Sequence, residues 1–144
     1  MEVVAEILVA RDCGIVHCGV SSQPSPPLAE LAAEFGLAPD LASYREIDAD
    51  SARWLAKSVL NQDMAYSAQI MSVARAAELA DQFLAQFGTE GARFYTNGDF
   101  HESRRQKLTL SDVAWNPVTS ATFDTGVLII GLQYSGCLWV EDED

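Results

Sequence analysis

Basic residues are scarce in this sequence. Nine lysines and arginines face twenty-one aspartates and glutamates, which gives a formal net charge of −12. A field of this sign repels phosphate backbones and anionic lipids, so nucleic acids and membranes are poor partners. The same field attracts basic proteins and speeds their encounter with the chain. Solubility alone is the alternative explanation for the excess of acids.

The sequence also lacks a disulfide framework, a membrane-spanning run and a secretory leader. Its three cysteines, Cys13, Cys18 and Cys137, are an odd number without paired spacing. No run approaches the ~20 apolar residues that cross a bilayer. Residues 1–4 contain an acid and no basic residue, unlike the start of a signal peptide. We therefore expect a cytoplasmic protein with free thiols that needs no metal and no cofactor.

Established catalytic and nucleotide-binding motifs are missing as well. The sequence contains no Gly-x-Ser-x-Gly elbow, no Walker sequence, no EF-hand loop and no His-Glu-x-x-His. Gly126 and Gly131 frame an apolar run instead of preceding a helix, as a phosphate-binding loop would. Zinc ligation by Cys13, His17 and Cys18 is disfavoured, because neighbouring residues of a strand point to opposite faces.

What is present indicates one α+β domain. The 144 residues, 49% of them hydrophobic, are typical of a single domain, which we place over residues 1–144. Alanine and leucine dominate the first part, whereas strand-forming residues gather after about residue 90. This asymmetry predicts helices in the N-terminal two thirds, packed on one face of a mostly antiparallel sheet. The sheet should have three to five strands, formed mainly by residues 91–141.

Periodicity and capping residues predict the individual elements. Helices are expected over 2–12, where a strand is the alternative, over 28–35, over 51–60 with Asp50 as N-cap, and over 73–87 with Ser72 as N-cap. Strands are expected over 15–20, 93–96, 126–131 and 137–140, whereas 44–47 is ambiguous. Asn97 and Gly98 are expected to form a tight turn of positive φ, with 108–110 as the returning strand.

The loop after this turn carries the most reactive residue types. Asp99, His101 and Glu102 could position a divalent ion or act as acid and base. The same residues also describe a solvated hairpin tip. The basic cluster at 104–107 would pair with these acids or hold a small anion. A nucleophilic pair of Cys137 with His101, or of Cys13 with His17, is a further possibility for an enzyme.

Four acids close the sequence. Glu141, Asp142, Glu143 and Asp144 follow a strand that Leu138 or Trp139 should anchor in the core, so the cluster is held in a defined place. Like charges in one cluster repel one another, and a basic groove on a partner or a bound cation would compensate for that repulsion. A solubilising end is the alternative interpretation.

Three segments in the last third resemble, in character, the immunity proteins that neutralise antibacterial toxins of secretion systems: Phe94–Gly98, Trp115–Thr119 with Phe123–Asp124, and Trp139–Asp144. The resemblance lies in a small, acidic α+β chain without a catalytic signature. It implies that the chain blocks a toxin, and it transfers no functional residue.

The leading hypothesis is therefore a non-enzymatic protein that sequesters a basic partner. In this hypothesis the acids Asp99, Glu102 and 141–144 take the place of an anionic substrate on the partner. Aromatic anchors would come from Tyr95, Trp115 and Tyr134. The alternative is a small intracellular enzyme that uses the Asp99, His101 and Glu102 loop or a cysteine thiol. A third interpretation is a domain of a larger assembly whose acidity is incidental.

Overall fold

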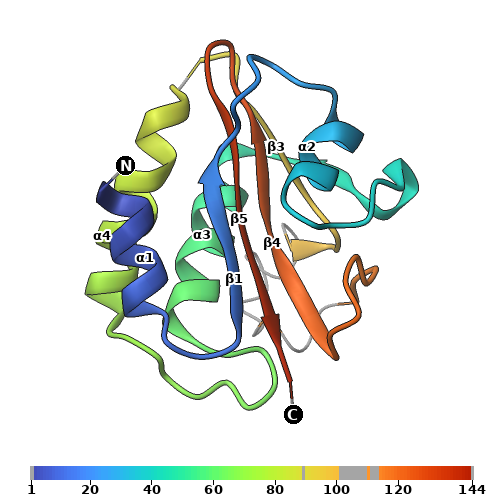
Figure 1. Ribbon diagram of the computed structural model, residues 1–144. Coiled ribbons are helices and arrows are strands. Elements are labelled where there is room, and N and C mark those ends of the chain that lie inside the picture. The colour runs from blue at the N-terminus through green and yellow to red at the C-terminus, as the bar shows by residue number, and fades with distance from the viewer. Residues whose placement is uncertain (1, 89, 101–109, 111–113, 144) are drawn as a thin grey trace.

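The chain forms an α+β fold around a five-stranded antiparallel sheet (Figure 1). The computed structural model describes residues 2–88, 90–100, 110 and 114–143. The sheet has the strand order β1-β5-β4-β3-β2. Its members are β1 (Ile15–Val20), β2 (Arg45–Ile47), β3 (Arg93–Thr96), β4 (Phe123–Ile130) and β5 (Ser135–Asp142). The predicted fold class is confirmed, and the ambiguous segment at 44–47 contributes β2.

Helices cover both faces of this sheet (Figure 1). They are α1 (Glu2–Ala10), α2 (Leu28–Glu34), α3 (Ala49–Asn61) and α4 (Val73–Leu84), with short 3₁₀ turns at Leu41–Ser43 and Ala85–Phe87. α1, α3 and α4 pack on one face, whereas α2 lies on the other. The expectation that the helices share one face is wrong for α2. The reason is that β4 and β5 are buried on both sides, as a continuous apolar run requires.

Two buried clusters fill the two faces. The larger one holds Leu79 and Phe83 of α4 against Val127 and Ile129 of β4. The smaller one lies under α2 and centres on Trp139, whose ring meets that of Tyr44 edge to face at a centroid distance of 6.0 Å. Each fully buried apolar side chain of this size contributes roughly 1.5–3 kcal/mol, so both faces of the sheet stabilise the fold.

Side-chain caps fix where the two long helices begin. The Ser72 hydroxyl accepts a hydrogen bond from the Arg75 amide at 3.1 Å, so the predicted N-cap of α4 is confirmed. The cap of α3 is Asp48, which accepts from the Ser51 amide at 2.7 Å, and not Asp50. Both residues suit the positive end of a helix, but Asp48 has the extended backbone of a cap, whereas Asp50 lies in the first turn.

The tight turn predicted after β3 is wrong. Asn97 and Gly98 are both buried, neither has a positive φ, and Gly98 forms an isolated antiparallel bridge with Trp115. β3 pairs with β2 and β4. The predicted return strand lies, apart from the buried Leu110, outside the described residues. The backbone bends at Asn97 directly after β3 without the predicted positive φ, and the Asn97 side-chain amide donates to the buried Asp124 carboxylate.

Candidate functional site

Asp142, one of the four predicted partner-binding acids at the C-terminus, points into the protein. Arg11 donates from Nη1 and Nη2 to its Oδ1 and Oδ2 at 3.0 and 2.9 Å, and both side chains are buried. The Met64 amide donates to Oδ2 at 2.9 Å, and Arg11 Nε donates to the Val59 carbonyl at 2.6 Å. The idea of a free four-residue acidic cluster is thereby corrected, since Asp142 ties the end of α1 to β5.

The other acids of this segment also have partners inside the chain. Glu141 lies 2.5 Å from Nε2 of His17, on the face of the sheet that α2 partly covers. Glu143 accepts from the Thr122 amide and from its hydroxyl, the latter at 2.5 Å. Asp144 lies outside the described residues. Among the three terminal acids that the structure describes, only Glu143 is therefore exposed.

The reactive loop is described only at its start. Asp99 is exposed and forms an ion pair with Arg45 across the β3–β2 edge of the sheet. His101 and Glu102, which complete the predicted acid–base set, lie outside the described residues, as does the basic cluster at 104–107. The described part of the loop thus contributes a neutralised carboxylate and no assembled acid–base pair.

The three predicted aromatic anchors differ in exposure. Tyr134 is 55% exposed at the tip of the β4–β5 hairpin. Tyr95 is half-buried, and the guanidinium of Arg93 lies 6.0 Å from its ring centroid. Trp115 is half-buried against Phe123, with a centroid distance of 5.6 Å. Of the three, Tyr134 is therefore the side chain most available to a partner.

Burial raises the pKa of all three cysteines, and Cys137 alone is a fully buried core residue. Burial raises the pKa of the Cys18 thiol to about 12, and it raises the pKa of the fully buried Cys137 well above its ordinary value. Cys137 Sγ donates to the His17 carbonyl at 3.6 Å. Cys13 is half-buried, and burial raises its pKa as well. A nucleophilic cysteine needs a lowered pKa, so these thiols are poorly suited to catalysis.

Asp124 is the centre of a buried polar network that no local sequence pattern predicts. Its carboxylate, which is completely buried, accepts hydrogen bonds from Trp139 Nε1 at 3.2 Å and Asn97 Nδ2 at 3.0 Å. It also accepts from the Thr119 hydroxyl at 3.0 Å and the Val118 amide at 3.2 Å. Burial raises the pKa of Asp124, while these donors lower it. Because every bond is internal, the network stabilises the fold and offers nothing to a ligand.

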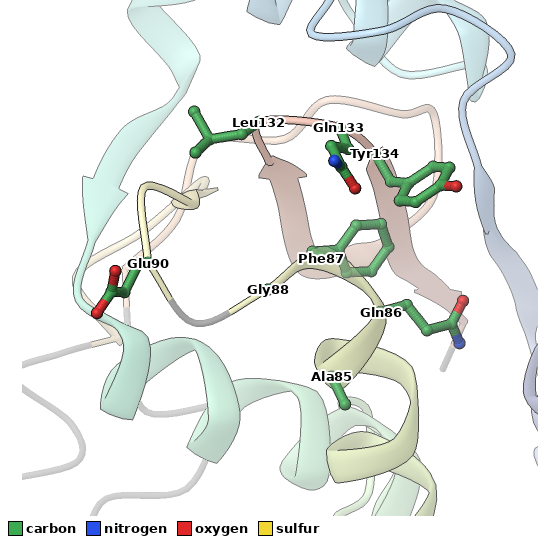
Figure 2. A pocket seen from close by; sticks show the side chains of 8 residues that line it. All are labelled: Ala85, Gln86, Phe87, Gly88, Glu90, Leu132, Gln133 and Tyr134. Atoms are coloured by element: carbon green, nitrogen blue, oxygen red, sulfur yellow. The ribbon is translucent and has the colours of Figure 1, made fainter.

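A surface hollow lies where the β4–β5 hairpin meets the end of α4 (Figure 2). It holds about 340 Å³ and is lined by residues 85–88, Glu90 and residues 132–134. A second hollow of about 290 Å³ adjoins it, with Ala85 and Gly88 lining both. The second hollow lies between the start of α3 and the end of α4, and its other lining residues are Ala49, Asp50, Arg53, Asp81, Leu84 and Phe94. We call the two together the hairpin groove.

Every arginine that the structure describes forms an ion pair with a carboxylate of the same chain. The pairs are Arg11–Asp142, Arg45–Asp99, Arg53–Asp81, Arg75 with Glu6 and Glu78, and Arg93–Glu46. Several exposed acids form no ion pair with a described residue: Glu2, Asp12, Glu30, Asp50 and Glu90. The surplus negative charge therefore stays on the surface, and no described arginine is free to hold an anion.

Among the described residues, no three His, Cys, Asp or Glu side chains gather as the ligands of a metal ion would. In the described part of the chain, no helix has the length and apolar character needed to cross a bilayer. No family model, curated protein or solved structure matches the chain. The charge distribution and the hairpin groove are therefore the features of the described residues that bear on function.

Proposed function

We propose that this chain is a non-enzymatic binding protein that sequesters a basic protein partner in the cytoplasm. The observation that carries the proposal is the pairing of every described arginine with a carboxylate of the same chain. The described residues therefore carry exposed acids without a cationic partner among them, and these acids give the surface its negative charge. Such a surface attracts cationic proteins over about a Debye length, ~10 Å at 0.1 M salt.

The partner we propose is a toxin domain whose groove binds an anionic substrate, so that the chain acts as an immunity protein. Exposed carboxylates would occupy the positions that substrate anions take on the toxin. Charge complementarity of this kind raises the association rate and selects against acidic partners. Asp142 is excluded from this role by its bonds to Arg11, whereas Glu143 and the unpaired acids remain available.

The enzyme alternative has less support in the described residues. Its thiol version conflicts with the raised pKa values of Cys13, Cys18 and Cys137. Its loop version depends on His101 and Glu102, which lie outside the described residues, and on Asp99, which Arg45 already neutralises. Substitution of His101 by alanine discriminates between the hypotheses, because an enzyme that uses this loop loses activity and a binder keeps its partner.

The test is affinity capture of the tagged chain from its native host at low salt, followed by elution along a salt gradient. The proposal predicts one stoichiometric partner of basic isoelectric point that is released as salt rises. A variant with Glu2→Gln, Asp12→Asn and Glu30→Gln has fewer exposed, unpaired acids and should release the partner at lower salt. Absence of any partner at every salt concentration would contradict the proposal.

A further inference from the structure

We propose that the hairpin groove is the docking site for a basic segment of the partner that also carries an apolar side chain. This inference rests on the proposed function, because it names the surface through which the partner would be held. It commits to a protein segment with lysine or arginine next to a leucine-like residue.

The second hollow of the groove is lined mainly by apolar side chains. These are Leu84 and Ala85 at the end of α4, Phe94 of β3 and Ala49 at the start of α3. Gly88, with a φ of 78°, ends the 3₁₀ turn and lines both hollows. An apolar side chain of a partner that entered this hollow would be removed from water. The site is built from secondary-structure elements, and this desolvation favours binding.

The rim of the groove is acidic. Three carboxylates line it, those of Asp50, Asp81 and Glu90, against a single arginine, Arg53. Arg53 donates to both carboxylate oxygens of Asp81, at 2.6 and 3.1 Å, so that this pair is internally neutral. The exposed acids Asp50 and Glu90 make no ion pair with a described residue, and they supply the unbalanced charge. A cationic side chain on either side of an apolar one complements this arrangement.

The flank of the groove offers contact area. Leu132 and Tyr134 at the tip of the hairpin are 74% and 55% exposed, and Figure 2 shows them on the same side of the hollow as Gln133. The hairpin tip is held in place: Ser25 donates from its hydroxyl to the Gly131 carbonyl at 2.8 Å. A large exposed aromatic on a fixed support is typical of the anchors that dominate interface energies.

The first experiment follows amide chemical shifts of the isotope-labelled chain during titration with a defined probe. The probe is a blocked hexapeptide with two leucines between two pairs of lysines. Two control peptides replace the leucines by serines or the lysines by glutamates. The proposal predicts shifts at Asp50, Ala85, Glu90 and Leu132 with the first peptide, and little change with either control. Shifts confined to other surfaces, or equal binding of the serine peptide, would overturn it.

Two charge-reversed variants sharpen the test. Asp50→Lys with Glu90→Lys reverses both unpaired acids of the groove. Glu30→Lys with Asp12→Lys makes the same change in net charge on exposed acids that do not line the groove. Glu30, like Asp50, lies in the first turn of its helix, so both variants lose one favourable helix-end charge. The groove variant should bind the lysine–leucine peptide roughly tenfold more weakly, whereas the control variant should change affinity less than about twofold.

The same variants separate this inference from the proposed function. A wild-type chain that captures a basic partner, together with a groove variant that captures it equally well, would overturn the docking site and leave the proposed function standing. The expected result is that the groove variant no longer captures the partner, whereas the control variant still captures it and releases it at lower salt than wild type. A wild-type chain without any partner contradicts the proposed function, and the docking site fails with it.

Discussion

Arg11 and Asp142 meet as a bidentate ion pair in the interior, although 131 residues separate them in the sequence. The pair joins the segment after α1 to the end of β5, and its further bonds to Val59 and Met64 tie in the end of α3 and the residues after it. The relationship decides how the acidic C-terminus is understood. An acid that sequence composition places in a partner-binding cluster is an internal component of the fold.

Substitution of Arg11 by alanine should therefore lower the free energy of unfolding by about 3–5 kcal/mol, because it leaves the Asp142 carboxylate buried without its counter-ion. The matched control is Arg53→Ala, which breaks the exposed pair with Asp81 and should cost less than about 1 kcal/mol. Urea denaturation of the three proteins measures both changes. Similar losses for the two variants would contradict the structural role of the buried pair.

Asn97 should contribute to stability through its side chain. Its amide donates to the Asp124 and Asn116 carbonyls, and its Oδ1 accepts from the Thr125 hydroxyl at 2.8 Å. Asn97→Ala leaves buried polar groups without partners and should cost about 1–3 kcal/mol. Asn116→Ala is the control, since that residue is exposed and takes part through its backbone. Equal stability of the two variants in urea would argue against the network.

Asp124 should make stability depend on pH. Burial raises its pKa in the folded chain above the value of the unfolded chain. Its contribution is thus fully present below the unfolded pKa, about 3.9, and is lost as pH rises through the folded pKa. Asp124→Asn removes this titration. The advantage of wild type over the variant in free energy of unfolding should shrink from pH 4 towards neutrality, and an advantage that grows with pH would contradict the expected direction.

Helices and strands that have a local sequence pattern can be predicted from the sequence far better than the candidate site. Ser72, followed by apolar residues at helical spacing, predicts α4, and the apolar run at 126–131 predicts β4, because both patterns lie within a few residues. Asn97 and Gly98 lead to a wrong prediction, because the dipeptide Asn-Gly is typical of a tight turn. The sequence does not indicate that this asparagine is buried in a polar network. The position of β2 depends on pairing with β3 and has no comparable local pattern.

The candidate site depends on contacts between segments that are distant in the sequence. The hairpin groove combines the ends of α3 and α4 with residues 132–134, and no periodicity reports which of these segments meet. The residue type of Tyr134 predicts a binding anchor, and this residue lines the groove. The sequence predicts Asp50 as a helix cap and does not indicate that it lines the groove. The burial of Asp142 likewise cannot be predicted without knowing that Arg11 lies next to it in the fold.

The thiols should react in the order of their burial. At pH 8 a disulfide reagent should modify Cys13 first, because it is the least buried of the three. Cys18, with a pKa raised to about 12, holds about one thiolate in a thousand molecules even at pH 9 and should react slowly. Cys137 should react only when the chain unfolds in denaturant. Fast modification of Cys137 in the native protein would contradict its placement in the core.

The most direct test of the account is the association rate of the captured partner with the purified chain as salt increases from about 0.01 M to about 1 M, which shortens the Debye length from ~30 Å to ~3 Å. Binding driven by surplus acids predicts an association rate that falls at least about tenfold over this range, with a dissociation rate that changes much less. It also predicts a smaller fall for the chain with amides at Glu2, Asp12 and Glu30. An association rate that does not depend on salt would contradict the account.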